Sequence, residues 1–188
     1  LGTNDDGFTL ISDNGIVYHS IQNTKNIPNF LTTYPLEDSQ QKNQDIYNQS
    51  FSAERYGNEL RWIFETFGED ENLFRKHILT KLNIQPGQRI LITGCGLGGD
   101  VGAVAEAVGA KGEVYAQDLA PEMIIAAAKR VKELSFNTEN VHFSICDAQS
   151  LPFLDGFFDG VFHFGGINLF ADIGMAIGEM ARVVRSGG

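Results

Sequence analysis

Hydrophobic and polar positions change their spacing near residue 84, and this change divides the chain. From Ile84 onward, short apolar runs alternate with segments whose apolar residues recur at helical spacing. Apolar runs that are too short for helices and end in glycine or in an acid are typical of buried parallel strands. The sequence predicts strands at 89–93, 113–117, 141–146 and 158–164, and helices at 99–109, from Pro121, and at 172–184.

This alternation of strands and helices predicts an α/β fold with a mostly parallel sheet and helices on both of its faces. The periodic apolar residues of the last two helices should point inward. For the helix from Pro121 these are Met123, Ile124, Ala127 and Val131, and for the final helix they are Ile173, Ala176, Ile177, Met180 and Val184.

The first 82 residues follow a different pattern. Residues 1–34 read as a small β-rich appendage, with strands at 8–11 and 16–21 around a turn at 12–15. A hairpin is marginal alone, so it must pack on something. Residues 35–82 read as a helical lid segment, and residues 83–188 as the core domain. Residues 37–48 are polar and read as a loop that then becomes helical. The two expected helical regions lie at 51–67 and 69–82, the second burying Leu73, Phe74, Ile78, Leu79 and Leu82.

A glycine-rich loop follows the first core strand, at Gly94, Gly96, Gly98 and Gly99. Glycine permits positive φ and close approach of the backbone to a ligand. The helix behind the loop would present free N–H groups to an anionic group. The spacing fits both a dinucleotide-binding loop and a loop for S-adenosylmethionine (SAM), so this motif alone does not decide between them.

Polar residues end each of the next three strands, and in parallel sheets ligands bind beyond those ends. The second strand ends at Asp118, whose two oxygens suit a ribose diol, although an acid before Pro121 also caps a helix. The third ends at Asp147, followed by Ala148. An acid there can accept a hydrogen bond from the exocyclic amine of adenine, a placement uncommon in dinucleotide enzymes. The fourth delivers His163 and Gly165.

Together these motifs resemble the class I SAM-dependent methyltransferases, of the small-molecule kind also called type 11. The resemblance covers residues 84–188 and rests on motifs in order at 90–99, 117–123, 146–153, 158–161 and 179–188. It implies a Rossmann-like, doubly wound sheet, with the small N-terminal β and helical part as an appendage. In that family the sheet continues beyond a segment like 185–188, so we expect a C-terminally incomplete core whose outer strand is open to pairing or dimerisation.

The resemblance also assigns roles. SAM is the implied cofactor and S-adenosylhomocysteine its product. Gly94, Gly96 and Gly98 form the loop around the methionine part of SAM, and Gly165 approaches the end that carries the transferred methyl group. Asp118 would hold the ribose and Leu119 would pack on the adenine face. Asp147 and Ala148 would bind the adenine edge. One departure is Ile92, where many members carry an acid two residues before the first loop glycine.

Methyl transfer from a sulfonium depends mainly on alignment, and a base is needed only when the acceptor must lose a proton. His163 is the candidate base, against the alternative of a structural histidine. Tyr47 and Tyr56 are candidates for the acceptor pocket, against a role in the core. The runner-up functions are a nicotinamide-dependent oxidoreductase and a non-catalytic SAM-fold module used for assembly.

Composition narrows the partners. The formal net charge of −10 argues against a surface that follows nucleic-acid phosphates. The sequence has no apolar run of membrane-spanning length and a polar N-terminus, so we expect a cytoplasmic protein. Cys95 and Cys146 are too few for a zinc cluster, and we expect no metal. The expected partner is a small, uncharged or cationic methyl acceptor.

Overall fold

The computed structural model describes residues 3–4, 7–11, 16–20, 27–31, 36–49, 51–135 and 138–188. Within these residues, one sheet has the strand order β1-β2-β3-β4-β7-β6-β5-β8. Four strands form the parallel core of this sheet: β5 (Arg89–Thr93), β6 (Glu113–Asp118), β7 (Val141–Ile145) and β8 (Gly160–Phe162). The predicted α/β fold with a mostly parallel sheet is thus confirmed.

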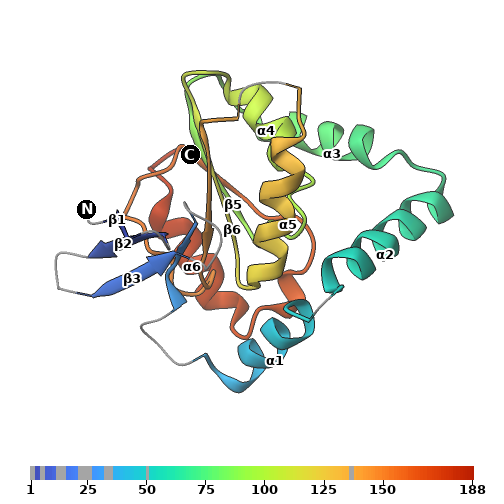
Figure 1. Ribbon diagram of the computed structural model, residues 1–188. Helices are drawn as coiled ribbons and strands as arrows, with labels where there is room; N and C mark the ends of the chain where they lie inside the picture. The colour runs from blue at the N-terminus through green and yellow to red at the C-terminus, as the bar shows by residue number, and fades with distance from the viewer. Residues whose placement is uncertain are drawn as a thin grey trace.

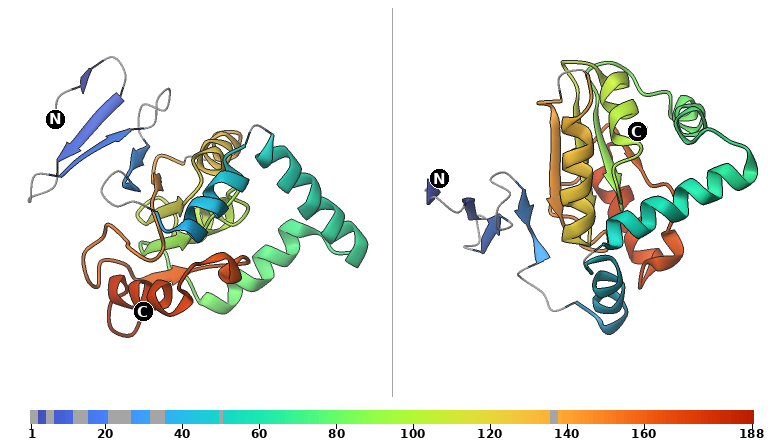
Figure 2. Two further views of the ribbon diagram at one scale, coloured as in Figure 1. Left: turned by 90° about the horizontal axis from the view of Figure 1, so that it is seen from below. Right: turned by 45° about the vertical axis from the view of Figure 1, so that its right-hand side comes forward.

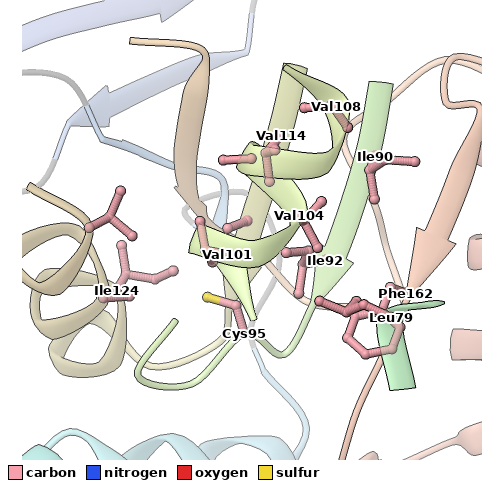
Figure 3. Packing of buried hydrophobic residues seen from close by; sticks show 14 of the residues in the cluster. Leu79, Ile90, Ile92, Cys95, Val101, Val104, Val108, Val114, Ile124 and Phe162 are labelled. Atoms are coloured by element: carbon pink, nitrogen blue, oxygen red, sulfur yellow. The ribbon is translucent and has the colours of Figure 1, made fainter. Parts of the chain in front are cut away.

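Strand β5 lies between β6 and β8 and pairs in parallel with both. Its apolar residues alternate between the two faces of the sheet, and all of them are buried. Ile90 and Ile92 join the cluster on the face covered by α4 (Val101–Val108) and α5 (Pro121–Lys132), which Figure 3 shows from close by. Leu91 points to the opposite face and joins Phe158. A strand buried on both faces explains the continuous apolar run.

Helix α6 (Ile173–Val183) covers the face opposite α4 and α5, as Figure 2 shows from below. The predicted inward face of α5 is confirmed, because Met123, Ile124, Ala127 and Val131 are all buried. The prediction for α6 was only partly correct. Ala176 is fully buried, but Ile173 and Ile177 are 42% and 50% exposed. Ile177 borders a groove beside β8, the last strand of the sheet, where the sheet no longer covers the helix.

The N-terminal strands extend the same sheet. β2 (Gly7–Ile11) and β3 (Val17–Ser20) pair antiparallel, as the hairpin prediction requires, although the predicted turn at 12–15 lies outside the described residues. β1 (Thr3–Asn4) pairs with β2. β4 (Pro28–Asn29) connects β3 to β7, with which it pairs in parallel through Asn29 and Ile145. The hairpin therefore obtains its support from the edge of β7.

Three helices precede the core: α1 (Asp38–Tyr47), α2 (Ser52–Phe67) and α3 (Glu71–Leu79), the last continuing as the 3-10 turn η2 (Thr80–Leu82). Figure 1 shows α1 across one end of the sheet and α2 extending away from it. The predicted buried face of residues 69–82 was largely wrong. Leu79 is buried and Ile78 half-buried, whereas Leu73, Phe74 and Leu82 are exposed.

A buried ion pair holds helix α3 on the core in addition to the packing of Leu79 and Ile78. The Arg75 guanidinium lies 2.8 Å from Asp100, at the start of α4, and 2.7 Å from Glu71 on its own helix. It also stands over the Phe164 ring, 5.3 Å from the ring centre. A charge that is both paired and buried holds a helix at one position. Periodicity alone does not reveal such an anchor.

We expect Phe158→Ala to lower the free energy of unfolding by about 3–5 kcal/mol, because the ring is fully buried and its loss leaves a cavity. Leu154→Ala, in the same connection but at a side chain 77% exposed, is the matched control and should change it by less than about 0.5 kcal/mol. Urea unfolding followed by circular dichroism measures both. Equal losses in the two variants would contradict this assignment of the core.

Candidate functional site

The carboxyl ends of β5, β6, β7 and β8 open onto one cleft, and α1 and α2 close it from the other side. The cleft is lined by every sequence-predicted site residue except Gly98: Tyr47, Tyr56, Gly94, Gly96, Asp118, Leu119, Asp147, Ala148, His163 and Gly165. Residues far apart in the chain are thus brought together, because parallel strands place all their carboxyl ends at one edge.

The glycine loop needs glycine for two different reasons. Gly94 has φ +58°, and a Cβ there would lie 3.2 Å from the His163 ring, inside the cleft. Gly98 has φ +70°, and a Cβ there would lie 2.9 Å from the Cβ of Ala127 on α5. Gly94 therefore keeps the cleft open beside His163, whereas Gly98 lies outside the lining and lets the loop pack on α5.

Asp118 joins the two turns that form the floor of the cleft. One carboxylate oxygen accepts the N–H of Gly96 at 2.9 Å, and the other accepts the N–H of Ala120 at 2.9 Å. Burial raises the pKa of the Asp118 carboxyl, and these backbone donors partly offset the rise. Each oxygen has two lone pairs, so each keeps acceptor capacity for a ligand hydroxyl.

Asp147 lies across the cleft in a similar backbone turn. Its Oδ1 accepts the N–H of Gln149 at 3.0 Å, while its Oδ2 accepts from the side-chain amide of Gln40 on α1. Burial raises the pKa of the Asp147 carboxyl, and the hydrogen bonds from Gln149 and Gln40 oppose this rise. Ala148, next to it, is buried and lines the same wall.

The tautomer of His163 is fixed by its position. Its Nδ1 lies 2.8 Å from the carbonyl oxygen of Thr93, which can only accept, so Nδ1 carries the proton. In the neutral imidazole, Nε2 then has a free lone pair. Nε2 is buried, and no hydrogen-bond partner for it exists within the described ranges. The Phe170 ring packs against the imidazole, with 4.9 Å between ring centres. The arrangement leaves one basic nitrogen for a ligand.

The sequence analysis did not predict two groups of residues that line the cleft. One is the amide row of α1, formed by Gln40, Asn43 and Gln44, and the other is Leu169 and Phe170 after β8. The amides share one helix face with Tyr47 at the spacing i, i+3, i+4 and i+7, a polar periodicity that could have been noticed. Tyr47 in turn packs edge-on against Tyr56, with 5.9 Å between ring centres, and burial raises the pKa of Tyr56.

Comparison with known proteins agrees with this geometry. A family model described as a methyltransferase domain matches residues 90–188, more than half of the chain. The chain belongs to this methyltransferase family. A demethylmenaquinone methyltransferase of Staphylococcus epidermidis is 34% identical over 120 residues, which make up 64% of this chain and 48% of that protein. The chain thus spans about half the length of the curated relatives it matches.

Solved structures support the same family. A SAM-dependent methyltransferase from Aquifex aeolicus is 25% identical with a TM-score of 0.55, covering 59% of this chain and 58% of that one. A methyltransferase from Methanococcus maripaludis, at 18% identity and a TM-score of 0.60, covers 83% and 64% and shows the fold. The resemblance to class I SAM-dependent methyltransferases, with their Rossmann-like fold and SAM as the family's cofactor, is confirmed.

The residues of the cleft fit this cofactor. The absence of a side chain at Gly94 and Gly96 leaves room beside His163 and Tyr56. The carboxylates of Asp118 and Asp147 supply acceptors on two sides of the cleft. The structure places no group of three or more metal-ligating side chains together in the described ranges. No helix in the described part of this chain is long and apolar enough to cross a membrane.

The turn after Ala148 is held by α6. The N–H of Leu151 donates to the Glu179 carboxylate at 2.8 Å, and Arg182 donates to the carbonyl oxygens of Leu151 and Phe153 at 2.9 and 2.8 Å. Arg182 also bonds Glu179 itself at 2.6 Å. This cluster fixes the segment that carries Asp147 and Ala148.

The Glu179 cluster predicts an acid-sensitive part of the stability. Hydrogen bonding from Arg182 lowers the pKa of Glu179 below its ordinary 4.5, so the unfolded state binds the proton more tightly. The stabilisation is complete above pH 4.5 and is lost as the pH falls through the lower folded value. In Glu179→Gln this part of the pH dependence should disappear.

Urea unfolding of both proteins between pH 3 and pH 7 tests this, and the wild-type advantage should shrink toward the acid end. Glu69→Gln, at an exposed glutamate before α3, is the control and should leave the pH profile unchanged. An advantage of wild type over Glu179→Gln that stays constant with pH would contradict the prediction.

Proposed function

We propose that this chain binds SAM in the cleft at the strand ends and forms the catalytic core of a methyltransferase acting on a small molecule. One observation carries the proposal. Two carboxylates, two glycines with positive φ and a histidine with a free nitrogen converge on the same cleft from four consecutive strand ends. The family membership of residues 90–188 supports the cofactor.

Each lining residue then has a task in binding. Gly94 and Gly96 accommodate the methionine part, and Asp118 accepts hydrogen bonds from the ribose hydroxyls. Leu119 packs on the adenine face, while Asp147 accepts from the adenine amine and the Ala148 N–H meets a ring nitrogen. SAM, when bound, supplies an electrophilic methyl group on a sulfonium centre. Gly165 leaves space at the end of the cleft where that methyl group would lie.

His163 is the base in this proposal. Because Nδ1–H is held by the carbonyl of Thr93, Nε2 can accept a proton from an acceptor hydroxyl or amine without any change of ring orientation. The nitrogen is buried, so water does not compete for it. The role of the protein is to align acceptor and donor for in-line displacement and to hold the released proton.

The acceptor wall favours an apolar, flat molecule. Leu169, Phe170 and Tyr47 line the cleft and supply mainly hydrocarbon and ring surface, and Phe170 packs against His163. The relatives named demethylmenaquinone methyltransferases agree with this choice of acceptor. We therefore propose an acceptor with a ring and a removable proton, with methyl transfer to that ring or its substituent.

Cofactor binding is tested with S-adenosylhomocysteine by titration calorimetry. Asp118→Asn should weaken binding about 10-fold or more, because one acceptor oxygen becomes an NH₂ donor that cannot accept from ribose. Asp45→Asn, at an exposed carboxylate of α1, is the control and should bind as wild type does. Binding of NADH with no heat from S-adenosylhomocysteine would overturn the proposed function.

The base is tested separately. His163→Asn should leave S-adenosylhomocysteine affinity within about 3-fold of wild type, but should slow transfer of radiolabelled methyl to reduced demethylmenaquinone by about 10²–10⁴-fold. Full activity in His163→Asn would exclude the imidazole as base.

A further inference from the structure

Gln40 already donates a hydrogen bond to Asp147, the carboxylate that the proposed function assigns to the adenine amine. Its side-chain Nε2 donates to Asp147 Oδ2, and the residue is only 7% exposed. Its Oε1 accepts the backbone N–H of Glu37 at 2.7 Å, which closes the capping box at the start of α1. The amide is thus held at both ends, so its NH₂ group is directed at Asp147 by the helix itself.

Acceptor capacity is exhausted at Oδ2 of Asp147, the oxygen that Gln40 contacts, whereas Oδ1 accepts one N–H and keeps one lone pair. Oδ2 also lies 3.4 Å from the side-chain amide of Gln149, and Oδ1 accepts the Gln149 N–H. A carboxylate oxygen has two lone pairs, so Oδ2 already has its full set of donors. A new N–H donor at Oδ2 must displace one that is present. Gln40 is the one that belongs to a separate, peripheral helix.

Two further amides hold α1 over the cleft. Gln44 Nε2 donates to the carbonyl of Leu119 at 3.0 Å, and Asn43 Nδ2 donates to the carbonyl of Leu169 at 2.6 Å. These contacts reach the turns after β6 and β8, whereas Gln40 reaches the turn after β7. α1 is therefore attached to the cleft by polar contacts, which exchange more readily than a packed apolar face.

The volume of the cavity agrees with a position of α1 that narrows the cleft. With α1 in this position the cavity volume is about 120 Å³. Small-molecule sites that enclose their ligand usually measure about 300–1,000 Å³. The cleft walls have the right groups for the cofactor, and a shift of α1, which lines one side, would enlarge the space between them.

We propose that Gln40 is a placeholder for the adenine amino group, so that cofactor binding exchanges one N–H donor on Asp147 for another and releases the first turn of α1. The inference rests on the proposed function, because it uses the assignment of Asp147 to adenine. In the ligand-free protein Gln40 keeps the buried carboxylate paired. On binding, its departure moves α1 outward and opens the space that the acceptor needs.

The test compares the affinities of two ligands that differ at the adenine amine. Gln40→Ala removes the competitor, so it should bind S-adenosylhomocysteine about 5- to 10-fold more tightly than wild type. S-inosylhomocysteine carries a carbonyl oxygen in place of the amine, so at that position it presents an acceptor and cannot replace Gln40 as a donor. S-inosylhomocysteine should bind more weakly than S-adenosylhomocysteine, and Gln40→Ala should not increase its affinity. Calorimetry on the chain of 188 residues measures both ligands.

Matched controls come from the same helix. Gln41→Ala, at an exposed glutamine that bonds Asp45, should leave both affinities unchanged. Gln44→Ala loosens α1 without touching Asp147, so any change should be equal for the two ligands. The melting temperature of each variant without ligand shows that it folds, and the ligand-free side-chain amide signal of Gln40 in NMR should shift when S-adenosylhomocysteine is added.

Four outcomes decide between the possibilities. An amine-dependent gain in Gln40→Ala supports the placeholder. A loss of affinity in Gln40→Ala, or an equal gain for both ligands, overturns it, because Gln40 would then assist binding or act only through α1 docking. If wild type binds S-adenosylhomocysteine but the Gln40 amide signal does not move, the placeholder fails while the proposed function stands. If S-adenosylhomocysteine does not bind to wild type, the proposed function itself fails.

Discussion

Parallel pairing of β5 with both β6 and β8 is the constraint on which the rest of the molecule depends. It fixes the height at which each strand ends, and therefore brings the residues after Thr93, Asp118 and Phe162 to one edge of the sheet. The pairing is stable because β5 is buried on both faces, with Ile90 and Ile92 on one side and Leu91 on the other. Removing that burial would disperse the cleft as well as the core.

Polar groups are concentrated where the apolar core ends. Burial raises the pKa of the Asp118 and Asp147 carboxyls, and hydrogen bonds from nearby N–H donors partly offset the rise. The Nε2 atom of His163 is buried without a partner in the described part of the chain. A fold gains no stability from such groups, so their gathering in one cleft is the kind of local conflict expected at a functional site.

The helices before the core attach to it by polar contacts at different depths. Arg75 of α3 reaches Asp100 in a buried ion pair, which sets the position of α3 beside the glycine loop. α1 is held by side-chain amides at the rim of the cleft. A buried charge pair resists separation because each partner would lose its compensation, whereas amide contacts exchange at small cost. The attachment of α3 suits a fixed support for the glycine loop, and the attachment of α1 suits a cover of the cleft that moves.

Much of the core could be predicted from the sequence. The spacing of hydrophobic residues predicted the parallel sheet and the inward face of α5. The glycine loop and the acids at the strand ends predicted that Asp118, Asp147 and His163 lie together. These follow from local pattern and from the rule that parallel strands end at one edge. The same pattern failed for Leu73 and Ile177, because periodicity states which residues share a helix face and does not state what covers that face.

Tertiary structure alone decided the rest. The contact of Gln40 with Asp147 joins residues separated by 107 positions, and no local preference encodes it. The tautomer of His163 depends on a carbonyl of β5, and the support of the N-terminal hairpin depends on the free edge of β7. The sequence determined which chemical groups stand at the strand ends, and long-range packing determined which of them already have partners.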